Sequence, residues 1–160
     1  METRAAGPAD DDAIWRILEP MIRAGETYTL PRDLDRAAAL AYWSAPGHAV
    51  FVAGDGSDLL GTYFLRANQR GGGAHVANCG YVTAAEAAGR GVAAAMCAHS
   101  LDQARARGFR AMQFNFVVST NERAMALWQR LGFDIVGRLP QAFDHPHLGP
   151  VDAFVMYRML

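Results

Sequence analysis

The stretch NCGYVTAAEAAGRGVAAAM, residues 78–96, decides the fold of this chain. It begins as a strand that ends at Thr83, and it runs into a helix predicted over Val92–Arg107. Between the two, Gly89 and Gly91 let backbone N–H groups crowd around an anion, and the first helical turn adds unpaired donors. The stretch therefore predicts an anion-binding strand–loop–helix, with an ordinary glycine-rich turn before a helix as the alternative.

Two nucleotide-binding motifs fit this loop in part, and both fail. Gly89-x-Gly91-x-x-Ala94 has the form of a dinucleotide-binding fingerprint, but several residues separate its strand from the first glycine. That fingerprint also needs an acidic residue about 20 positions further on, and the next strand, AMQFNFVV, has no carboxylate at its tip. A P-loop needs a Gly-Lys-Ser/Thr run, and the chain contains no lysine.

The chain before this stretch predicts a strand, two helices and a hairpin. The strand is expected near Thr3–Ala6. Asp10 is expected to cap the first helix, which Gly25 ends, and the second helix covers Leu34–Trp43. A hairpin follows, because AVFVAG and LLGTYFLRAN flank the turn Asp55-Gly56-Ser57-Asp58.

The chain after this stretch predicts a strand, a short helix and two final strands. These are AMQFNFVV, the helix Asn121–Leu131, FDIVGRL and VDAFVMYRML. Gly80, inside the strand HVANCGYVT, suggests a bulge or a close approach of the backbone to a ligand. The order β, two helices, three strands, helix, strand, helix, two strands indicates a mixed α/β fold in a single domain over residues 1–160.

Composition excludes several classes of protein. Lys+Arg 15 against Asp+Glu 16 leaves a net charge of −1, which argues against nucleic-acid binding, and 51% hydrophobic content argues against disorder. Cys79 and Cys97 lie in apolar surroundings and are expected to be buried thiols rather than a disulfide framework. The acidic opening METRAAGPADDD does not read as a signal peptide, and the longest uncharged stretch, residues 37–54, is broken by Pro46 and Gly47. We expect a cytoplasmic protein with no membrane partner.

Two motifs make the chain resemble the GNAT superfamily of acyl-CoA-dependent N-acyltransferases. Residues 83–93 are similar to the signature Val-x-Pro-x-x-Arg/Gln-Gly-x-Gly-x-Gly/Ala, and residues 121–133 to Asn-x-x-Ala-x-x-Leu-Tyr-x-x-x-Gly-Phe. The chain departs from them where Ala85 replaces the proline, Ala88 the Arg/Gln and Trp128 the tyrosine. The segments NCGYVT, FNFVVSTN and VDAFVMYRML also resemble a bacterial subgroup distantly similar to fungal proline-analogue acetyltransferases. The resemblance implies a mixed, mostly antiparallel central sheet flanked by helices, with a β-bulge or splay at the acyl-CoA site.

The resemblance also implies a binding site for acetyl-CoA as cosubstrate. The loop would hold the pyrophosphate, and the strand before it would pair with the pantetheine arm, which offers amides as a strand edge does. We choose the N–H of Val82 as the donor to the thioester carbonyl. Trp128 cannot protonate the departing thiolate as the family's tyrosine does, so it is either a wall of the site or plain core. The implied cofactor-binding residues are Tyr81, Val82, Thr83, Gly89, Arg90, Gly91, Val92, Ala93, Ala94, Asn121 and Trp128.

The attacking amine must lose a proton, which requires a base or a water path. Glu26, with Tyr28, lies in the connector that borders the acceptor pocket in this superfamily, and it is either a substrate carboxylate or a solvated loop residue. Asn78 and Asn115 interrupt apolar alternation, so their amides need partners, which substrate or the strand itself would supply. His75 lies on the same strand as Asn78. These five are the candidate substrate-binding residues, and the candidate catalytic residues are Glu26, Asn78, Val82 and Asn115.

The resemblance implies an N-acetyltransferase that moves the acetyl group of acetyl-CoA to the amine of a small molecule, such as an amino acid or imino acid. The reaction would be direct attack through a tetrahedral intermediate. The alternatives are a protein N-acetyltransferase and a non-catalytic acyl-CoA-binding module, to which the missing tyrosine and Ala88 point. Asp144-His145-Pro146-His147 is a weak metal signal, and no metal is expected. We interpret this segment instead as a loop that borders the acceptor site. Many members pair through their last strands, so a homodimer is expected.

Overall fold

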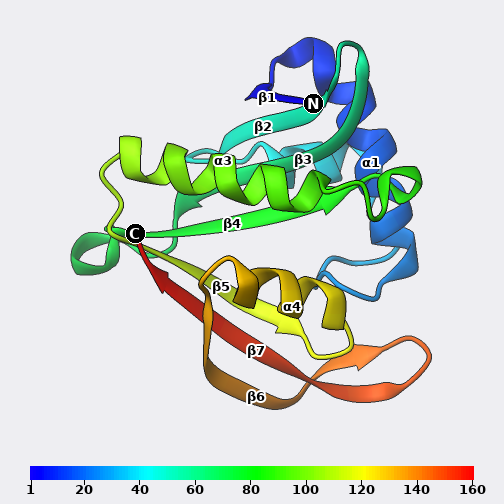
Figure 1. Cartoon of the computed structure of the whole chain (residues 1–160). Helices are drawn as coiled ribbons and strands as arrows, with labels where there is room; N and C mark the ends of the chain where they lie inside the picture. The colour runs from blue at the N-terminus through cyan, green and yellow to red at the C-terminus, as the bar shows by residue number, and fades with distance from the viewer.

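Seven strands form one sheet in the computed structural model, which describes residues 1–160 (Figure 1). Their order is β1-β2-β3-β4-β5-β7-β6, and every neighbouring pair is antiparallel except β4 and β5, which run parallel. The predicted succession of elements and the mostly antiparallel sheet flanked by helices are confirmed. The strands are β1 (Glu2–Ala5), β2 (Ala49–Asp55), β3 (Asp58–Ala67), β4 (Val76–Thr83), β5 (Ala111–Val118), β6 (Asp134–His145) and β7 (Gly149–Met159). The helices are α1 (Asp11–Ala24), α2 (Arg36–Trp43), α3 (Val92–Ala106) and α4 (Glu122–Arg130), with short 3-10 turns η1 (Pro8–Asp10), η2 (Gly71–Gly73) and η3 (Ala85–Ala87).

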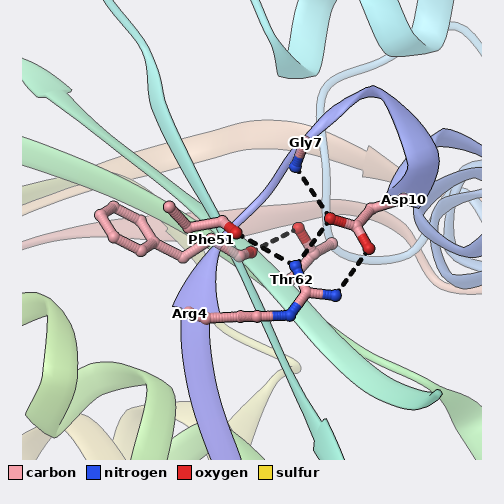
Figure 2. A network of polar contacts seen from close by, with 6 residues as sticks. Arg4, Gly7, Asp10, Phe51 and Thr62 are labelled. Carbon is pink, nitrogen blue, oxygen red and sulfur yellow. Dashed lines mark hydrogen bonds and ion pairs between the residues drawn. The ribbon is translucent and has the colours of Figure 1, made fainter. Parts of the chain in front are cut away.

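Helices cover both faces of the sheet, with α3 and α4 on one face and α1 and α2 on the other (Figure 1). Alternation along β3 produces contacts with both layers. The hydroxyl of Tyr63 lies 2.7 Å from Nδ1 of His99 in α3, whereas Thr62 accepts a hydrogen bond of 3.0 Å from the indole of Trp43 in α2. Thr62 in turn donates to the carbonyl of Phe51 at 2.9 Å, so its buried hydroxyl is fully paired (Figure 2).

The start of α1 differs from the prediction that Asp10 caps it. Asp10 already has helical backbone angles, and its side chain makes no cap hydrogen bond to α1. Its carboxylate instead accepts hydrogen bonds of 2.8 Å from both terminal nitrogens of Arg4 in β1 and from the N–H of Gly7 (Figure 2). The hydrogen bond from Arg4 lowers the pKa of Asp10 to about 2. The carboxylate therefore ties β1 to the first turn of α1 rather than capping that helix.

The sheet opens between its two parallel strands, as expected for the splay. Pairing of β4 with β5 stops after Ala77 and Met112, and Figure 1 shows the two strands diverging from there. Just beyond, the side-chain amide of Asn78 donates to the carbonyl of Gln113 at 3.0 Å. The bulge is not found in β4, which keeps an unbroken register with β3, and the irregularity lies in β5 between Phe114 and Val117, opposite β7. A side chain inserted between the strands thus marks the point where they separate.

Gly80 marks a close approach of side chains to the backbone of β4, at a position that also lines the cavity described below. A Cβ atom at this position would lie 2.6 Å from Cε1 of Phe64 and 2.8 Å from the hydroxyl oxygen of Tyr28. Both distances are too short for any residue except glycine. The missing side chain at Gly80 therefore lets the ring of Tyr28 lie against β4.

No helix of the protein combines the length and the apolar character that crossing a membrane requires.

Candidate active site

A cavity of about 780 Å³ fills the opening between β4 and β5. Its wall is made by both strands, the α1–α2 connector, the first turn of α3, and α4. The sequence-predicted residues that line it are Tyr28, Asn78, Tyr81, Val82, Thr83, Gly89, Gly91, Val92, Ala93, Ala94, Asn115, Asn121 and Trp128. Glu26, His75 and Arg90 do not line it.

The register of β4 decides which of its backbone groups face the cavity. The N–H of Ala84 donates to the carbonyl of Leu60, and the N–H of Asn68 donates to the carbonyl of Val76, so even-numbered residues of β4 pair with β3. The carbonyl of His75 faces β5, and odd-numbered residues share that side. Because Val82 belongs to the even set, its N–H points toward β3, which corrects our choice of donor. The N–H groups of Cys79, Tyr81 and Thr83 face the opening.

The loop before α3 presents backbone amides at the outer end of the cavity. Gly89 and Gly91 have φ of 81° and 78°, a left-handed conformation that glycine adopts without strain. The first turn of α3 leaves its N–H groups without helical partners. Arg90 differs from expectation, because its N–H is bound to the carbonyl of Ala87 and its exposed side chain is not part of the wall.

Arg123 brings positive charge to this loop. It lines the cavity from the first turn of α4, and its Nη2 lies 3.8 Å from the position that a Cβ of Gly89 would occupy. The sequence motif covers Arg123 only as an unspecified position, so sequence reasoning missed it. Its guanidinium lies near Gly89, one residue after Ala88, where the family signature has Arg or Gln, and it brings a cation to the loop in which Ala88 has none.

A cluster of polar side chains lies at the inner end of the cavity, where the strands separate. Nε of Arg66 donates to Oδ1 of Asn78 at 3.2 Å, and the amide of Asn115 donates to Oδ1 of Asn68 at 2.7 Å. The amide of Gln113 donates to Oδ1 of Asn115 at 2.9 Å. We call Arg66, Asn68, Asn78, Gln113 and Asn115 the amide cluster. Protein groups rather than substrate already occupy part of the hydrogen-bonding capacity of Asn78 and Asn115.

Two tyrosines line the cavity on the α1–α2 side. The hydroxyl of Tyr28 donates to the carbonyl of Tyr81 at 3.1 Å, which places Tyr28 against the edge of β4 that faces the cavity. Burial raises the pKa of Tyr28 well above its ordinary value and raises that of Tyr42. Burial likewise raises the pKa of the Cys79 thiol to about 12. All three groups are therefore neutral at pH 7, and none is a base there.

Glu26 lies at the rim rather than in the wall. Its side chain is 45% exposed, its neighbour Thr27 lines the cavity, and its Oε1 lies 3.6 Å from Nε2 of His147. His147 belongs to the β6–β7 turn, which lies near the open end of the sheet (Figure 1). The two segments that sequence analysis placed beside an acceptor pocket, the α1–α2 connector and the Asp144–His147 loop, therefore meet at this rim.

Trp128 is both packed and part of the wall. It is 8% exposed, and its ring lies 5.1 Å from that of Tyr81 and 5.2 Å from that of Phe114. His75 is remote, because it precedes β4 at the end where β4 and β5 are still paired. No group of three or more His, Cys, Asp or Glu side chains comes together in a way that could hold a metal ion.

Sequence reasoning missed Arg66 and Tyr42, which also line the cavity, and Asn68, which accepts a hydrogen bond from Asn115. Arg66 follows the apolar run LLGTYFL of β3. An arginine near the end of a buried strand is unusual, and this position could have indicated a site residue from the sequence. Asn68 and Tyr42 lie in a loop and in α2, and no local pattern joins them to β4.

Comparison with known proteins agrees with the site's geometry. Residues 13–133 match the family model described as the acetyltransferase (GNAT) family. The chain is 30% identical over 100 residues to N-acetyltransferase aca1 of Schizosaccharomyces pombe, a match covering 62% of this chain and 48% of that protein, so the chain spans about half of this relative's length.

Two solved structures resemble the whole chain. A GCN5-related N-acetyltransferase from Kribbella flavida is 42% identical with a TM-score of 0.94, covering 99% of this chain and 97% of that one. The protein yncA of Salmonella typhimurium, solved with its cofactor acetyl-CoA, is 22% identical with a TM-score of 0.87, covering 100% and 94%. The splayed sheet, the loop before α3 and the matched family model lead to one conclusion: the chain belongs to the acetyltransferase (GNAT) family.

Proposed function

We propose that this GNAT acetyltransferase transfers the acetyl group of acetyl-CoA to the amine of a small molecule, such as an amino acid or imino acid. The observation that carries the proposal is the free edge of β4, which offers the N–H groups of Cys79, Tyr81 and Thr83 to the cavity, next to the open amides of α3. An amide-containing arm pairs with such an edge as a strand would.

The residues present fit acetyl-CoA. The N–H groups of Gly91, Val92, Ala93 and Ala94 and the guanidinium of Arg123 would hold the pyrophosphate, because a helix N-terminus and a cation both favour an anion. Asn121, whose side chain is not used to cap α4, would contact the pantetheine arm. Trp128 would form the aromatic wall behind that arm. When bound, the thioester supplies an activated acetyl carbon.

The chain's groups would assist the attack in three ways. The N–H of Tyr81 or Cys79 would donate to the carbonyl oxygen, where negative charge develops as nitrogen bonds to carbon. The tetrahedral intermediate then re-forms its C=O bond and the C–S bond breaks with its electron pair on sulfur. The sulfur leaves as a thiolate without an obligatory acid near neutral pH, because the pKa of its thiol is about 8.5. The nitrogen loses its proton through water to the carboxylate of Glu26 at the rim, since the wall contains no aspartate, glutamate or histidine.

The test is release of free CoA thiol with a broad panel of small amines, repeated with Glu26→Gln and Asn78→Ala. We expect release with at least one small amine and reduced rates in both variants. Retained rates in both would remove these residue assignments and leave the transferase intact. Binding of acetyl-CoA without turnover of any amine would favour a non-catalytic module, and turnover of peptides alone would favour a protein N-acetyltransferase.

We also propose that two copies associate through β6. This strand is a free edge of the sheet, and it exposes Ile135, Val136 and Leu139 to 41%, 59% and 37%. Light scattering should give the mass of a dimer, and Val136→Lys should give that of a monomer. A monomeric parent protein would contradict the pairing.

A further inference from the structure

The charge on the cavity wall is uniformly positive. Three arginines line it, Arg66, Arg123 and Arg130, and no aspartate, glutamate, lysine or histidine does. Arg123 and Arg130 come from α4, and Arg123 lies against the loop proposed for the pyrophosphate. Arg66 comes from β3 and belongs to the amide cluster at the other end of the cavity. The phosphates therefore do not account for its charge.

The guanidinium of Arg66 is held in place and has no counter-charge. Asn78, which is 6% exposed, accepts from its Nε at 3.2 Å and is itself fixed by the bond from its amide to the carbonyl of Gln113. Arg66 makes no ion pair, and its two terminal nitrogens donate to no protein group, although its side chain is partly buried. A partly buried cation is costly to leave unpaired. Its forked end is preorganised for a planar anion.

No acidic side chain forms an ion pair with the guanidinium of Arg66. Burial raises the pKa of Tyr42 and lowers the pKa of His48, and the positive charge of Arg66 is a smaller influence that favours the deprotonated form of each. His48 is further fixed by a contact of 2.9 Å between its Nδ1 and the carbonyl of Trp43. Neither residue supplies the missing negative charge at neutral pH.

We propose, resting on the acetyltransfer proposed above, that Arg66 binds a carboxylate of the acceptor and so restricts the enzyme to amines that carry an anionic group. The distances along β4 suit a small amino or imino acid. Asn78, which positions Arg66, is one residue from Cys79 and three from Tyr81, or roughly 3–10 Å at the usual rise of a strand. An amine at the acetyl carbon and a carboxylate at Arg66 span this interval.

The test compares amino acids with their amides, which differ only in the negative charge. The parent enzyme should favour each acid over its amide by about tenfold or more in kcat/KM, as expected when a charge-assisted hydrogen bond is lost. Arg66→Gln should reduce the preference to below about threefold by slowing the acid alone. Arg66→Lys should retain part of it. Arg70→Gln is the matched control, because Arg70 is an exposed arginine four residues further on that does not line the cavity.

A second measurement separates this inference from the proposed reaction. Binding of N-acetyl amino acids and their amides, in the presence of CoA, is followed by saturation-transfer NMR. Selective binding of the acids that is lost in Arg66→Gln supports the inference even where no amine is turned over. Turnover of amides as fast as acids, or an unchanged preference in Arg66→Gln with acetyl-CoA affinity intact, overturns the inference and leaves the acetyltransfer standing.

Discussion

The outer and inner ends of the cavity are built from different parts of the polypeptide. At the outer end, the cleft-facing edge of β4, two glycines and the first turn of α3 present backbone amides, and most of their side chains are small. At the inner end, side chains from β3, β4, β5 and the segment after β3 form the amide cluster, and Tyr28 and Tyr42 line the same cavity. The backbone end can keep its geometry while side chains change, as the replacements of signature residues by Ala85 and Ala88 illustrate. The geometry of the side-chain end, in contrast, changes with each substitution.

The sharpest way to break this comparison is to enlarge Gly80, whose missing side chain leaves room for Phe64 and Tyr28. Gly80→Val would collide with Phe64 and Tyr28, so the Tyr28 ring must leave the cavity wall. We expect kcat/KM for the acceptor to fall by about 100-fold, with a loss of about 1–3 kcal/mol in unfolding free energy from overpacking. Acetyl-CoA affinity, measured by calorimetry, should change less than about threefold. Gly137→Val is the control, because its Cβ would meet nothing closer than 3.9 Å. A loss of acetyl-CoA affinity as large as the loss of kcat/KM for the acceptor would show that the two ends are not independent.

The second prediction concerns Arg123, the arginine of the cavity wall that lies near the loop before α3. Arg123→Ala should raise the KM for acetyl-CoA by about tenfold, because a charge-assisted hydrogen bond contributes about 1.5–3 kcal/mol. The acceptor KM should stay unchanged. Adding Ala88→Arg to this variant restores the family's side chain beside the loop and should recover most of the affinity. Failure of this rescue, with the double variant folded by circular dichroism, would mean that Arg123 does not stand in for the missing side chain.

The third prediction concerns the pH dependence of the reaction and the role of Glu26 at the rim. Since Tyr28, Tyr42 and Cys79 have raised pKa values and stay neutral, the rise of kcat/KM with pH should follow deprotonation of the acceptor amine. Glu26→Gln should lower kcat by about tenfold near pH 7, and the deficit should shrink at high pH, where the amine is already neutral. His147→Gln removes the partner of Glu26 but keeps the carboxylate, so it should retain most activity. A pH-independent deficit in Glu26→Gln would reduce that residue to a binding role.

The smallest effect is expected far from both ends, at the Arg4–Asp10 pair. Its carboxylate has a pKa of about 2, below the ordinary 3.8, so the pair stabilises the folded state above pH 4 and stops doing so as pH falls toward 2. Asp10→Asn should lower the unfolding free energy by about 1 kcal/mol at pH 7, a modest value because Arg4 is half exposed. Urea titrations should show the gap closing near pH 2, and kcat should not change. A gap that is constant with pH would assign the loss to packing.

The sequence predicted the local structure of the backbone end well and the contacts of the side-chain end poorly, for a physical reason. Gly89, Gly91 and the start of α3 form a local unit whose conformation and donors follow from neighbouring residues. Asn78 and Asn115 were singled out because a buried amide is anomalous in an apolar strand, yet their partners Arg66 and Gln113 lie on other strands.

Two misjudged residues show the same limit. Asp10 was expected to cap its own helix, but Arg4, six residues earlier, binds its carboxylate. Val82 was chosen as the oxyanion donor, but whether an N–H faces the opening depends on the pairing of β4 with β3, which spacing alone does not give. The roles of the site residues Glu26 and Arg123 stay predictions that the variants above test.

The unbroken pairing of β4 with β3 has a consequence for how such enzymes can diverge. One set of peptide groups in β4 pairs with β3, and the alternate set faces the cavity, where we propose that the thioester arm binds. Inserting or deleting a single residue in β4 would therefore exchange the two sets. Insertions or deletions in β4 should therefore abolish catalysis, whereas the α1–α2 connector and the β6–β7 turn should tolerate changes in length. New acceptor preferences would accordingly arise at the rim and in side chains, over a strand of fixed length.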